Sequence, residues 1–315
     1  MSKGALTSIA RAARTLRFPA LLLTAVALPA FASTASGCGG TKDGSGFDGV
    51  DSGTGGGGGL FGSGEGGTGP VFGGEGGSGV DAAADGCPQS ATLVYVTGEG
   101  SKLYSFYPPD QTFTLIGTLD CLSSPTHMTV DRQGNAWVVS AGQLYKASTA
   151  DASCAAVPTW KTNGNFSDFA LTFIGVSNAV DNTLYLLSDF GKLATFDIAS
   201  GALTNVGTVG VSSTLGDMTS NGDGSLYFLQ DVSTPKLYQF SPTDASTMNT
   251  SPISASGGGS QALAFWGGSF YAFENSAIYQ YDPMLKTTKG IGTAPLQVTG
   301  AGQSTCVPKT PPATK

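Results

Sequence analysis

Histidine and cysteine, the side chains most often used as catalysts and metal ligands near neutral pH, are rare in this chain of 315 residues. The sequence contains one histidine, His127, and five cysteines. A histidine has a pKa suited to general acid–base catalysis near neutral pH, and it is a common metal ligand. A lone imidazole is more often a hydrogen-bonded structural residue. With a single histidine, the sequence does not indicate any particular Ser-His-Asp triad, and the absence of a CxxC pair disfavours a zinc site. We therefore name no catalytic residue and treat His127 as a candidate binding residue.

Six aspartates lie in or beside segments expected to be turns, and together they are candidate oxygen ligands for calcium. They are Asp131, Asp181, Asp217, Asp223, Asp231 and Asp282. They fall at different places in the repeat described below, however, and aspartates in turns commonly bond to the local backbone. We expect most of them to form turns, with no cofactor, and keep calcium as the alternative.

Three short motifs recur over residues 87–306 at intervals of about 45 residues, the length of a four-stranded propeller blade. The first pairs an apolar residue with a small one: Met128-Thr129, Leu171-Thr172, Met218-Thr219, Leu263-Ala264 and Val298-Thr299. The second is an apolar strand that begins at residues 93, 136, 184, 226 and 270. The third, typified by KLYSF, begins at residues 102, 143, 192, 236 and 277. Each of these segments reads as a β-strand bounded by turn residues.

The order of the motifs predicts how the repeat array closes. The first copy begins with its second strand near Leu93, and the last small-residue motif, at Val298, has no blade after it. Pairing of these two segments would complete one blade and remove exposed sheet edges. We therefore predict an all-β fold, a five-bladed β-propeller closed by its C-terminal strand. The predicted blades cover 93–119 with 297–305, 127–158, 170–209, 217–254 and 262–294.

The repeat, LYxF followed by a turn and then xxIGT, resembles that of bacterial β-propellers of the quinoprotein-like and NHL/YVTN type over residues 91–306. The WD and GH pairs of WD40 blades are absent. The resemblance is to a style of repeat, so it implies the fold but assigns neither an activity nor a functional residue.

Four cysteines are predicted to form two disulfides, which indicate an oxidising compartment. Ring closure would bring Cys87 to Cys306, and Cys121 would then pair with Cys154. Four cysteines allow three pairings, and the sequence alone does not choose among them.

The ring would place His127 near the mouth of a central channel. The candidate channel-lining residues are the hydroxyls of the first motif: Thr129, Thr172, Thr219 and Thr299. Crowding at the axis is by itself a sufficient reason for small side chains there. Trp266, which precedes Gly267-Gly268, is the aromatic residue that we expect to be exposed.

The fifth cysteine, Cys38, follows an export signal in which basic residues precede an apolar run from Phe18 to Ala32, too short for a comfortable transmembrane helix. Ala35-Ser36-Gly37-Cys38 resembles the lipobox of bacterial lipoproteins, with alanine where leucine is usual. We predict a signal peptide over residues 1–37 and a lipid on Cys38 that holds the chain at the cell envelope, on the outer membrane or cell surface. Cleavage after Ala32, at an A-x-A site, is the alternative and would give a secreted protein.

Residues 38–86 are predicted to be a disordered tether, and residues 307–315 a disordered tail. From residue 39 to residue 86, 22 of 48 positions are glycine, so little apolar surface is available to offset the entropy of ordering. The formal net charge is −7, and no basic stripe exists to bind nucleic acid. Acyl chains are therefore the expected contact with membrane lipid.

Three classes of function remain. We favour a binding or scaffolding propeller for an unknown protein or small ligand. A calcium-dependent hydrolase or lactonase would need converging carboxylates at one end of the channel, and a carbohydrate-binding propeller would need similar aromatic groups in several outer clefts.

Overall fold

The computed structural model describes residues 87–175, 183–211, 216–222, 224–255, 259 and 261–311. All of them belong to the second of two units into which the chain divides, Phe72–Lys315. Cys38, the signal peptide and the tether lie outside the described residues, as do Asp181 and Asp223.

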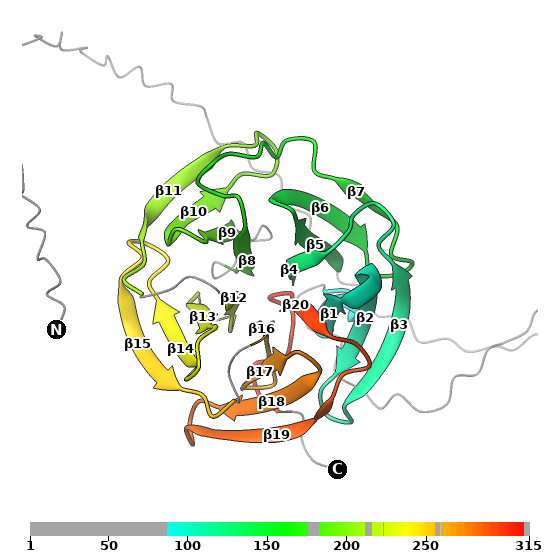
Figure 1. Cartoon of the computed structure of the whole chain (residues 1–315), viewed down its shortest axis with the longest axis vertical. Coiled ribbons are helices and arrows are strands. Elements are labelled where there is room, and N and C mark those ends of the chain that lie inside the picture. Colours follow the sequence, from blue (N-terminus) through cyan, green and yellow to red (C-terminus); the bar gives the residue numbers. More distant parts are fainter. Residues whose placement is uncertain are drawn as a thin grey trace, which may run out of the picture. The chain divides into compact units, whose positions relative to one another are not determined.

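Five antiparallel sheets of four strands each account for the strands of the described residues, and they are arranged radially around one axis (Figure 1). In order from the axis outward, blade 1 contains β20 (Val298–Gln303), β1 (Val94–Gly98), β2 (Lys102–Tyr107) and β3 (Thr112–Thr118). Blade 2 contains β4 (Pro125–Val130), β5 (Asn135–Ser140), β6 (Gln143–Ser148) and β7 (Cys154–Ala156). Blade 3 contains β8 (Phe169–Ile174), β9 (Thr183–Ser188), β10 (Lys192–Phe196) and β11 (Leu203–Thr208).

Blade 4 contains β12 (Gly216–Ser220), β13 (Leu226–Gln230), β14 (Lys236–Phe240) and β15 (Thr247–Pro252). Blade 5 contains β16 (Gln261–Trp266), β17 (Ser269–Glu274), β18 (Ala277–Asp282) and β19 (Thr287–Thr293). Two short 3-10 helices, η1 (Gln89–Thr92) and η2 (Glu99–Ser101), flank β1. No helix in the described part of the chain is long and apolar enough to cross a membrane.

The C-terminal strand closes the ring, as the motif order predicts. β20 pairs antiparallel with β1, from Val94 opposite Gln303 to Gly98 opposite Val298. The first blade therefore takes its inner strand from the far end of the chain, and the prediction of a five-bladed propeller with this closure is confirmed.

Burial falls from the axis outward. Every residue of β8, β16 and β17 is buried, whereas no residue of the outer strands β3 and β15 is. Aromatic side chains pack neighbouring blades together. The ring of Phe106 in blade 1 meets those of Tyr271 and Phe273 in blade 5 edge to face, with centroids 6.0 and 5.8 Å apart. Packing of this kind between blades supplies the apolar core that one sheet alone lacks.

The strand register corrects one equivalence drawn from the motifs. Pairing with the second strand places Ala301-Gly302, rather than Val298-Thr299, opposite the same blade positions as Met128-Thr129. The reason is crowding between β20 and β4, because a Cβ at Gly302 would lie 2.5 Å from the Met128 carbonyl oxygen. Thr299 therefore lies nearer the start of its strand than the other three threonines.

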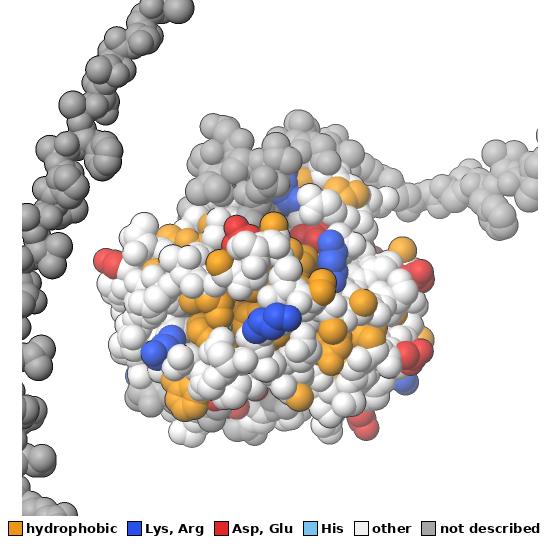
Figure 2. Space-filling model, turned by 90° about the horizontal axis from the view of Figure 1, so that it is seen from above, with side chains coloured by type: hydrophobic (Ala, Val, Ile, Leu, Met, Phe, Trp, Pro, Cys, Tyr) orange, Lys and Arg blue, Asp and Glu red, His pale blue; other side chains and the backbone are white. Residues whose placement is uncertain are grey.

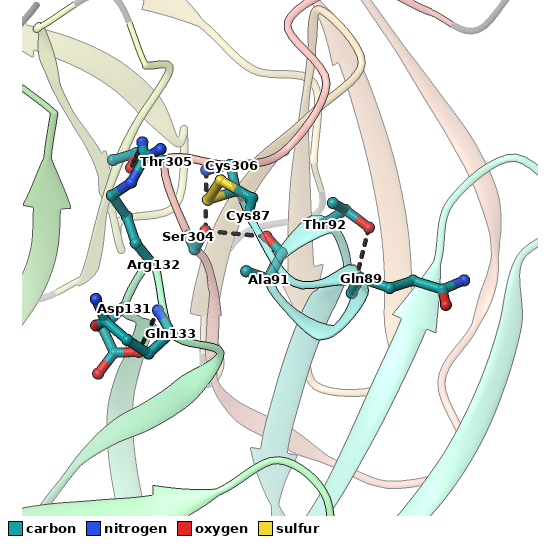
Figure 3. Close-up of a disulfide and its surroundings, with 10 residues drawn as sticks. All are labelled: Cys87, Gln89, Ala91, Thr92, Asp131, Arg132, Gln133, Ser304, Thr305 and Cys306. Carbon is teal, nitrogen blue, oxygen red and sulfur yellow. Dashed lines mark hydrogen bonds between the residues drawn. A yellow bond between two sulfur atoms is a disulfide. The ribbon is translucent and has the colours of Figure 1, made fainter. Parts of the chain in front are cut away.

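The structure contains both predicted disulfides. Cys87 bonds to Cys306 across a sequence separation of 219 residues, and Cys121 bonds to Cys154 across 33 residues. The first bridge lies where η1 meets the end of β20 (Figure 3), and Ser304 reinforces the closure. The Ser304 hydroxyl donates to the Ala91 carbonyl oxygen at 2.9 Å and accepts from the Cys306 backbone N–H at 2.9 Å.

The two faces of the ring differ in what they carry. We call the face on which the inner strands begin the entry face, and the face on which they end the exit face. The Cys87–Cys306 bridge lies on the exit face because β20 ends there. Residues 307–311, part of the predicted tail, continue along it: Val307 is buried, and the Gly267 N–H donates to the Pro308 carbonyl oxygen at 2.7 Å.

Candidate functional site

A pocket of about 740 Å³ opens at the axis on the entry face, and we call it the mouth pocket. Its wall includes the η2 segment and the loop that leads into β4. Four of its residues occupy equivalent positions near the start of four inner strands. They are Thr126, Gly216, Gln261 and Thr299. The ring symmetry therefore builds the pocket, and the differences between blades determine its chemistry.

His127 lies in this wall and pairs with Asp217 across the axis, since they belong to the non-adjacent blades 2 and 4. Its Nδ1 is 3.0 Å from Asp217 Oδ1, and its Nε2 is 3.9 Å from Asp168 Oδ1. The strand registers give His127 and Asp217 equivalent positions in their blades. The other three blades carry small residues there, Ala170, Ala262 and Gly300. Those small residues leave the space in which the pair can meet.

The two carboxylates favour the protonated form of His127. Burial lowers the pKa of the imidazole, but the hydrogen bond to Asp217 and the charges of Asp217 and Asp168 outweigh burial and raise the pKa above its ordinary value of 6.5. An imidazolium donates to Asp217 and has no lone pair with which to accept a proton. His127 is therefore suited to holding the ring together and offering positive charge, rather than to general-base catalysis.

Asp217 is buried completely within β12, so it does not form a turn as most of the aspartates were expected to. Burial raises its pKa, while the hydrogen bond and charge of His127 and two backbone N–H groups oppose that effect. The Met218 and Leu263 N–H groups each donate to its carboxylate at 3.0 Å. One carboxylate thus links the inner strands of blades 2, 4 and 5.

Other predicted acidic residues have local roles. Asp131 accepts from the Asn135 N–H at 2.8 Å and from the Trp137 indole at 3.0 Å. Asp282 accepts from the Met284 and Leu285 N–H groups in the turn after β18. Asp231 lines the mouth pocket. Within the described residues, no three His, Cys, Asp or Glu side chains gather in a way that could hold a metal ion.

The predicted channel threonines divide between the two ends of the axis. Thr129, Thr172 and Thr219 are buried, whereas Thr299 lies in the mouth pocket wall. At the exit end, Gln303 crosses from blade 1 to blades 4 and 5. Its Nε2 donates to Thr219 Oγ1 at 2.7 Å and to the Ser220 carbonyl at 2.8 Å, and its Oε1 accepts from the Phe265 N–H at 3.1 Å. This network ties the inner strands together at the end away from the mouth pocket.

Sequence reasoning missed three of these residues. Asp168, Gln261 and Gln303 belong to no repeated motif, because the other blades carry different residue types at the equivalent positions. The available signal was a polar residue next to an inner-strand motif, such as Gln261 two residues before Leu263-Ala264. His127 was found only because the sequence contains no other histidine.

The prediction that Trp266 is exposed is wrong. Its side chain is only 3 % exposed, because η1 and blade 1 both lie against it. The indole Nε1 donates to the Thr92 carbonyl oxygen at 2.9 Å, and the ring meets Tyr107 edge to face. Trp137 and Trp160 are buried as well, so none of the three tryptophans offers an open stacking platform.

A second cleft, of about 650 Å³, lies between blades 2 and 3. Its lining combines Phe173 and Phe196 with the charged residues Asp131, Arg132 and Lys146. Lys146 Nζ lies 3.5 Å from Asp131 Oδ2 and 5.3 Å from the centre of the Trp137 ring. Figure 2 views the rim from the side of β7 and β11, where hydrophobic and basic side chains reach the surface among polar ones. The charged groups named here already interact with neighbours, so this cleft is a weaker candidate than the mouth pocket.

The sequence was compared with models of protein families and with curated proteins, and neither comparison found a match.

Proposed function

We propose that this chain is an exported, lipid-anchored binding module that holds a small ligand in the mouth pocket. The fold is that of a propeller, and its two disulfides indicate an extracytoplasmic protein. The observation that carries the proposal is the mouth pocket itself, which is concave, lies at the axis and is lined by polar side chains from several blades. Such a cavity with a few convergent polar groups is a typical small-molecule site.

Binding fits this pocket better than catalysis. Its one imidazole is held between Asp217 and Asp168, which favours the imidazolium over the neutral form that a general base requires. Hydrogen bonds near both ends of the axis, at Asp217 and at Gln303, join the inner strands of different blades around the pocket. A preformed site loses little conformational entropy when it binds a ligand.

The position of Cys87 supports display of the pocket away from an N-terminal anchor. Cys87 lies on the exit face, and the mouth pocket lies on the entry face. A chain anchored at Cys38 would therefore join the ring at the face opposite the pocket.

A fragment titration of the full chain, followed by NMR, tests the binding proposal. The fragments are small anions, cations, neutral amides and polyols, each added at millimolar concentration. We expect some of them to shift the backbone resonances of His127, Gln261 and Thr299 together. Shifts confined to the cleft between blades 2 and 3, or no shift at the mouth pocket with any fragment, would contradict the proposal.

Anchoring is tested separately by Cys38→Ser. The thiol is the atom that receives the lipid, so this variant should lose incorporation of labelled palmitate and move from the membrane to the soluble fraction of cells. Cys87→Ser is the matched control, since it removes a different cysteine and should leave palmitate incorporation unchanged. Full membrane retention of the Cys38→Ser protein would refute lipid attachment.

A further inference from the structure

Gln261 is the buried polar side chain of the mouth pocket that has no hydrogen-bond partner among the described residues. It opens β16 and is 6 % exposed, and neither its Nε2 nor its Oε1 forms a hydrogen bond. Buried polar groups in proteins are nearly always paired, so an unpaired one calls for an explanation. Its place in the pocket wall provides one, because a bound ligand could supply both missing hydrogen bonds.

The comparison with Gln303 shows that an amide in this core can be fully paired. Gln303 lies on the same ring of inner strands, at the exit end, and both of its amide atoms have partners on blades 4 and 5. The two glutamines share chemistry and burial and differ in which end of the axis they occupy. The paired amide stabilises the exit end, and the unpaired amide is at the end that opens to the outside.

The groups around Gln261 define the ligand that it would accept. A carboxamide presents a donor and an acceptor side by side, and another amide is its geometric complement. Two carboxylates of the lining, Glu99 and Asp231, outnumber its one imidazolium, His127, so the excess of negative charge disfavours an anion. The lining contains hydroxyls from serine and threonine and no phenylalanine, tyrosine or tryptophan, so stacking of an aromatic ligand has no platform.

We propose that the mouth pocket binds an uncharged or cationic small molecule through a secondary amide group, which pairs with the side-chain amide of Gln261. This inference depends on the proposed function and specifies its ligand. Both amide atoms of Gln261 are shielded from solvent, so pairing requires the side chain to rotate toward the pocket. No internal hydrogen bond has to break for that rotation, because the amide has none.

Four probes with the full chain test this inference by NMR titration. N-acetylalanine N-methylamide carries the amide of a peptide, and N-acetylglucosamine carries the same group on a sugar. Glucose offers hydroxyls without the amide, and acetate offers a carboxylate of similar size to the acetyl group. We expect at least one amide probe to shift the Gln261 side-chain NH2 resonances, and glucose and acetate to leave them unchanged. Binding of only one amide probe supports the inference and identifies the source of the amide.

Gln261→Met is the matched variant, since methionine keeps the length of the side chain and removes both polar atoms. It should raise the dissociation constant of the bound amide probe at least about fivefold, the effect of losing a paired polar group. Gln133→Met is the control, because Gln133 lies in the turn after β4 on the exit face. It should bind the probe like the parent chain. Thermal melting of each variant establishes that it is folded.

Three results would overturn the inference: equal binding of glucose or acetate, unchanged affinity in Gln261→Met, or no response to either amide probe. If a fragment of another class shifts the mouth pocket resonances in the earlier titration, the proposed function stands and only the amide assignment fails. If no compound of either set shifts them, both fail.

Discussion

At the scale of single residues, the described part of the ring contains an ion pair across its axis, His127–Asp217, and a buried amide without a hydrogen-bond partner, Gln261. Neither feature could be predicted from the positions of these residues in the sequence. His127 and Asp217 are 90 residues apart, and they meet because equivalent positions of different blades converge on one axis. Replacing His127 should lower the stability of the fold, whereas replacing the unpaired Gln261 should raise it.

His127→Gln should destabilise the fold and remove most of its pH dependence near neutrality. The imidazole pKa is raised in the folded chain, so its contribution to stability is complete below about 6.5 and is lost as the pH rises through the folded-state value. Asp217 enters this prediction as the carboxylate that holds the imidazolium, because its oxygens accept from the Met218 and Leu263 N–H groups as well as meeting His127 Nδ1. Removing the partner of a buried carboxylate costs about 3 kcal/mol.

Urea unfolding of both proteins between pH 5.5 and 8.5 checks this prediction. The free energy of unfolding of the parent should fall as the pH rises, while that of His127→Gln should be lower at pH 6 and nearly flat. The sequence has no second histidine to produce such a slope. A parent whose stability rises with pH over this range would contradict the assigned charge states.

Gln261→Met should stabilise the protein by about 1 kcal/mol, because it removes two buried polar atoms that have no hydrogen bond. A stabilising change at a site that loses ligand binding is the pattern expected where function has been retained at the expense of stability. The midpoint of urea unfolding, measured without ligand, checks the prediction. A loss of more than about 1 kcal/mol would show that the amide has a stabilising partner.

At the scale of elements, glycines determine how closely neighbouring segments approach. The recurring IGT or VGT motif of the fourth strand is opposite a shift in register in blades 1, 3 and 5. In blade 1 the shift falls between Leu103 and Tyr104, so Ile116 bulges, and Gly117 lies against the next blade. A Cβ on Gly117 would be 2.9 Å from the Cβ of Ala152, and one on Gly207 would be 3.0 Å from that of Ala245. The motif thus encodes both the bulge and the contact between blades.

Gly302→Ala tests the close approach of β20 to β4. The added Cβ would lie 2.5 Å from the Met128 carbonyl oxygen and 2.6 Å from the Thr129 Cα, and backbone atoms at an axis cannot easily move away. We expect a loss of roughly 2–3 kcal/mol in the free energy of unfolding. Gly290→Ala is the matched control within β19, since the nearest atom to its Cβ is 3.9 Å away. Its unfolding free energy should stay within about 0.5 kcal/mol of the parent's. Equal effects of the two substitutions would argue against the crowded closure.

The sequence predicted the elements better than the register between them. Apolar and aromatic strand motifs repeat because each blade must pack against two neighbours, so strand count, blade bounds and closure can be found from periodicity. The equivalence of Val298-Thr299 with Met128-Thr129 was wrong because the closing strand carries Ala301-Gly302 at that place. Glycine stands there instead of the threonine of the motif, so the sequence pattern does not reveal the equivalence. Trp266 was misplaced for a related reason, because the segment that covers it, around Thr92, precedes the first repeat.

The functional residues were less predictable. No other blade has a glutamine at the position of Gln261 or of Gln303. A residue that does not recur cannot be found from the period of the repeat. Asp217 looked like one of several turn aspartates, and its full burial within a strand follows from pairing with a histidine of another blade. Such residues depend on which blades oppose each other across the axis, and that is known only after the ring has closed.

At the scale of the whole molecule, the two disulfides act on very different lengths of chain. The Cys87–Cys306 bridge encloses nearly the entire propeller, whereas the Cys121–Cys154 bridge joins segments 33 residues apart. Ser304 and η1 hold the first bridge next to the end of β20 (Figure 3). Ring closure therefore depends on a strand pair and a covalent link at the same place.

Replacing both Cys87 and Cys306 with serine should cost more stability than replacing both Cys121 and Cys154. In the chain-entropy account, the longer loop contributes roughly 1–2 kcal/mol more, because closing it removes more freedom from the unfolded chain. Denaturant unfolding of the two double variants under the same oxidising conditions measures the difference. A greater loss from the shorter loop would indicate that native contacts around Cys121 outweigh chain entropy.

The most direct test of the account is a crystal structure of the full chain soaked with N-acetylalanine N-methylamide. We expect density for the probe in the mouth pocket, with its amide group within hydrogen-bonding distance of both polar atoms of Gln261 and beside the His127–Asp217 pair. Density for the probe only in the cleft between blades 2 and 3, or a mouth pocket occupied solely by water at saturating probe, would contradict it.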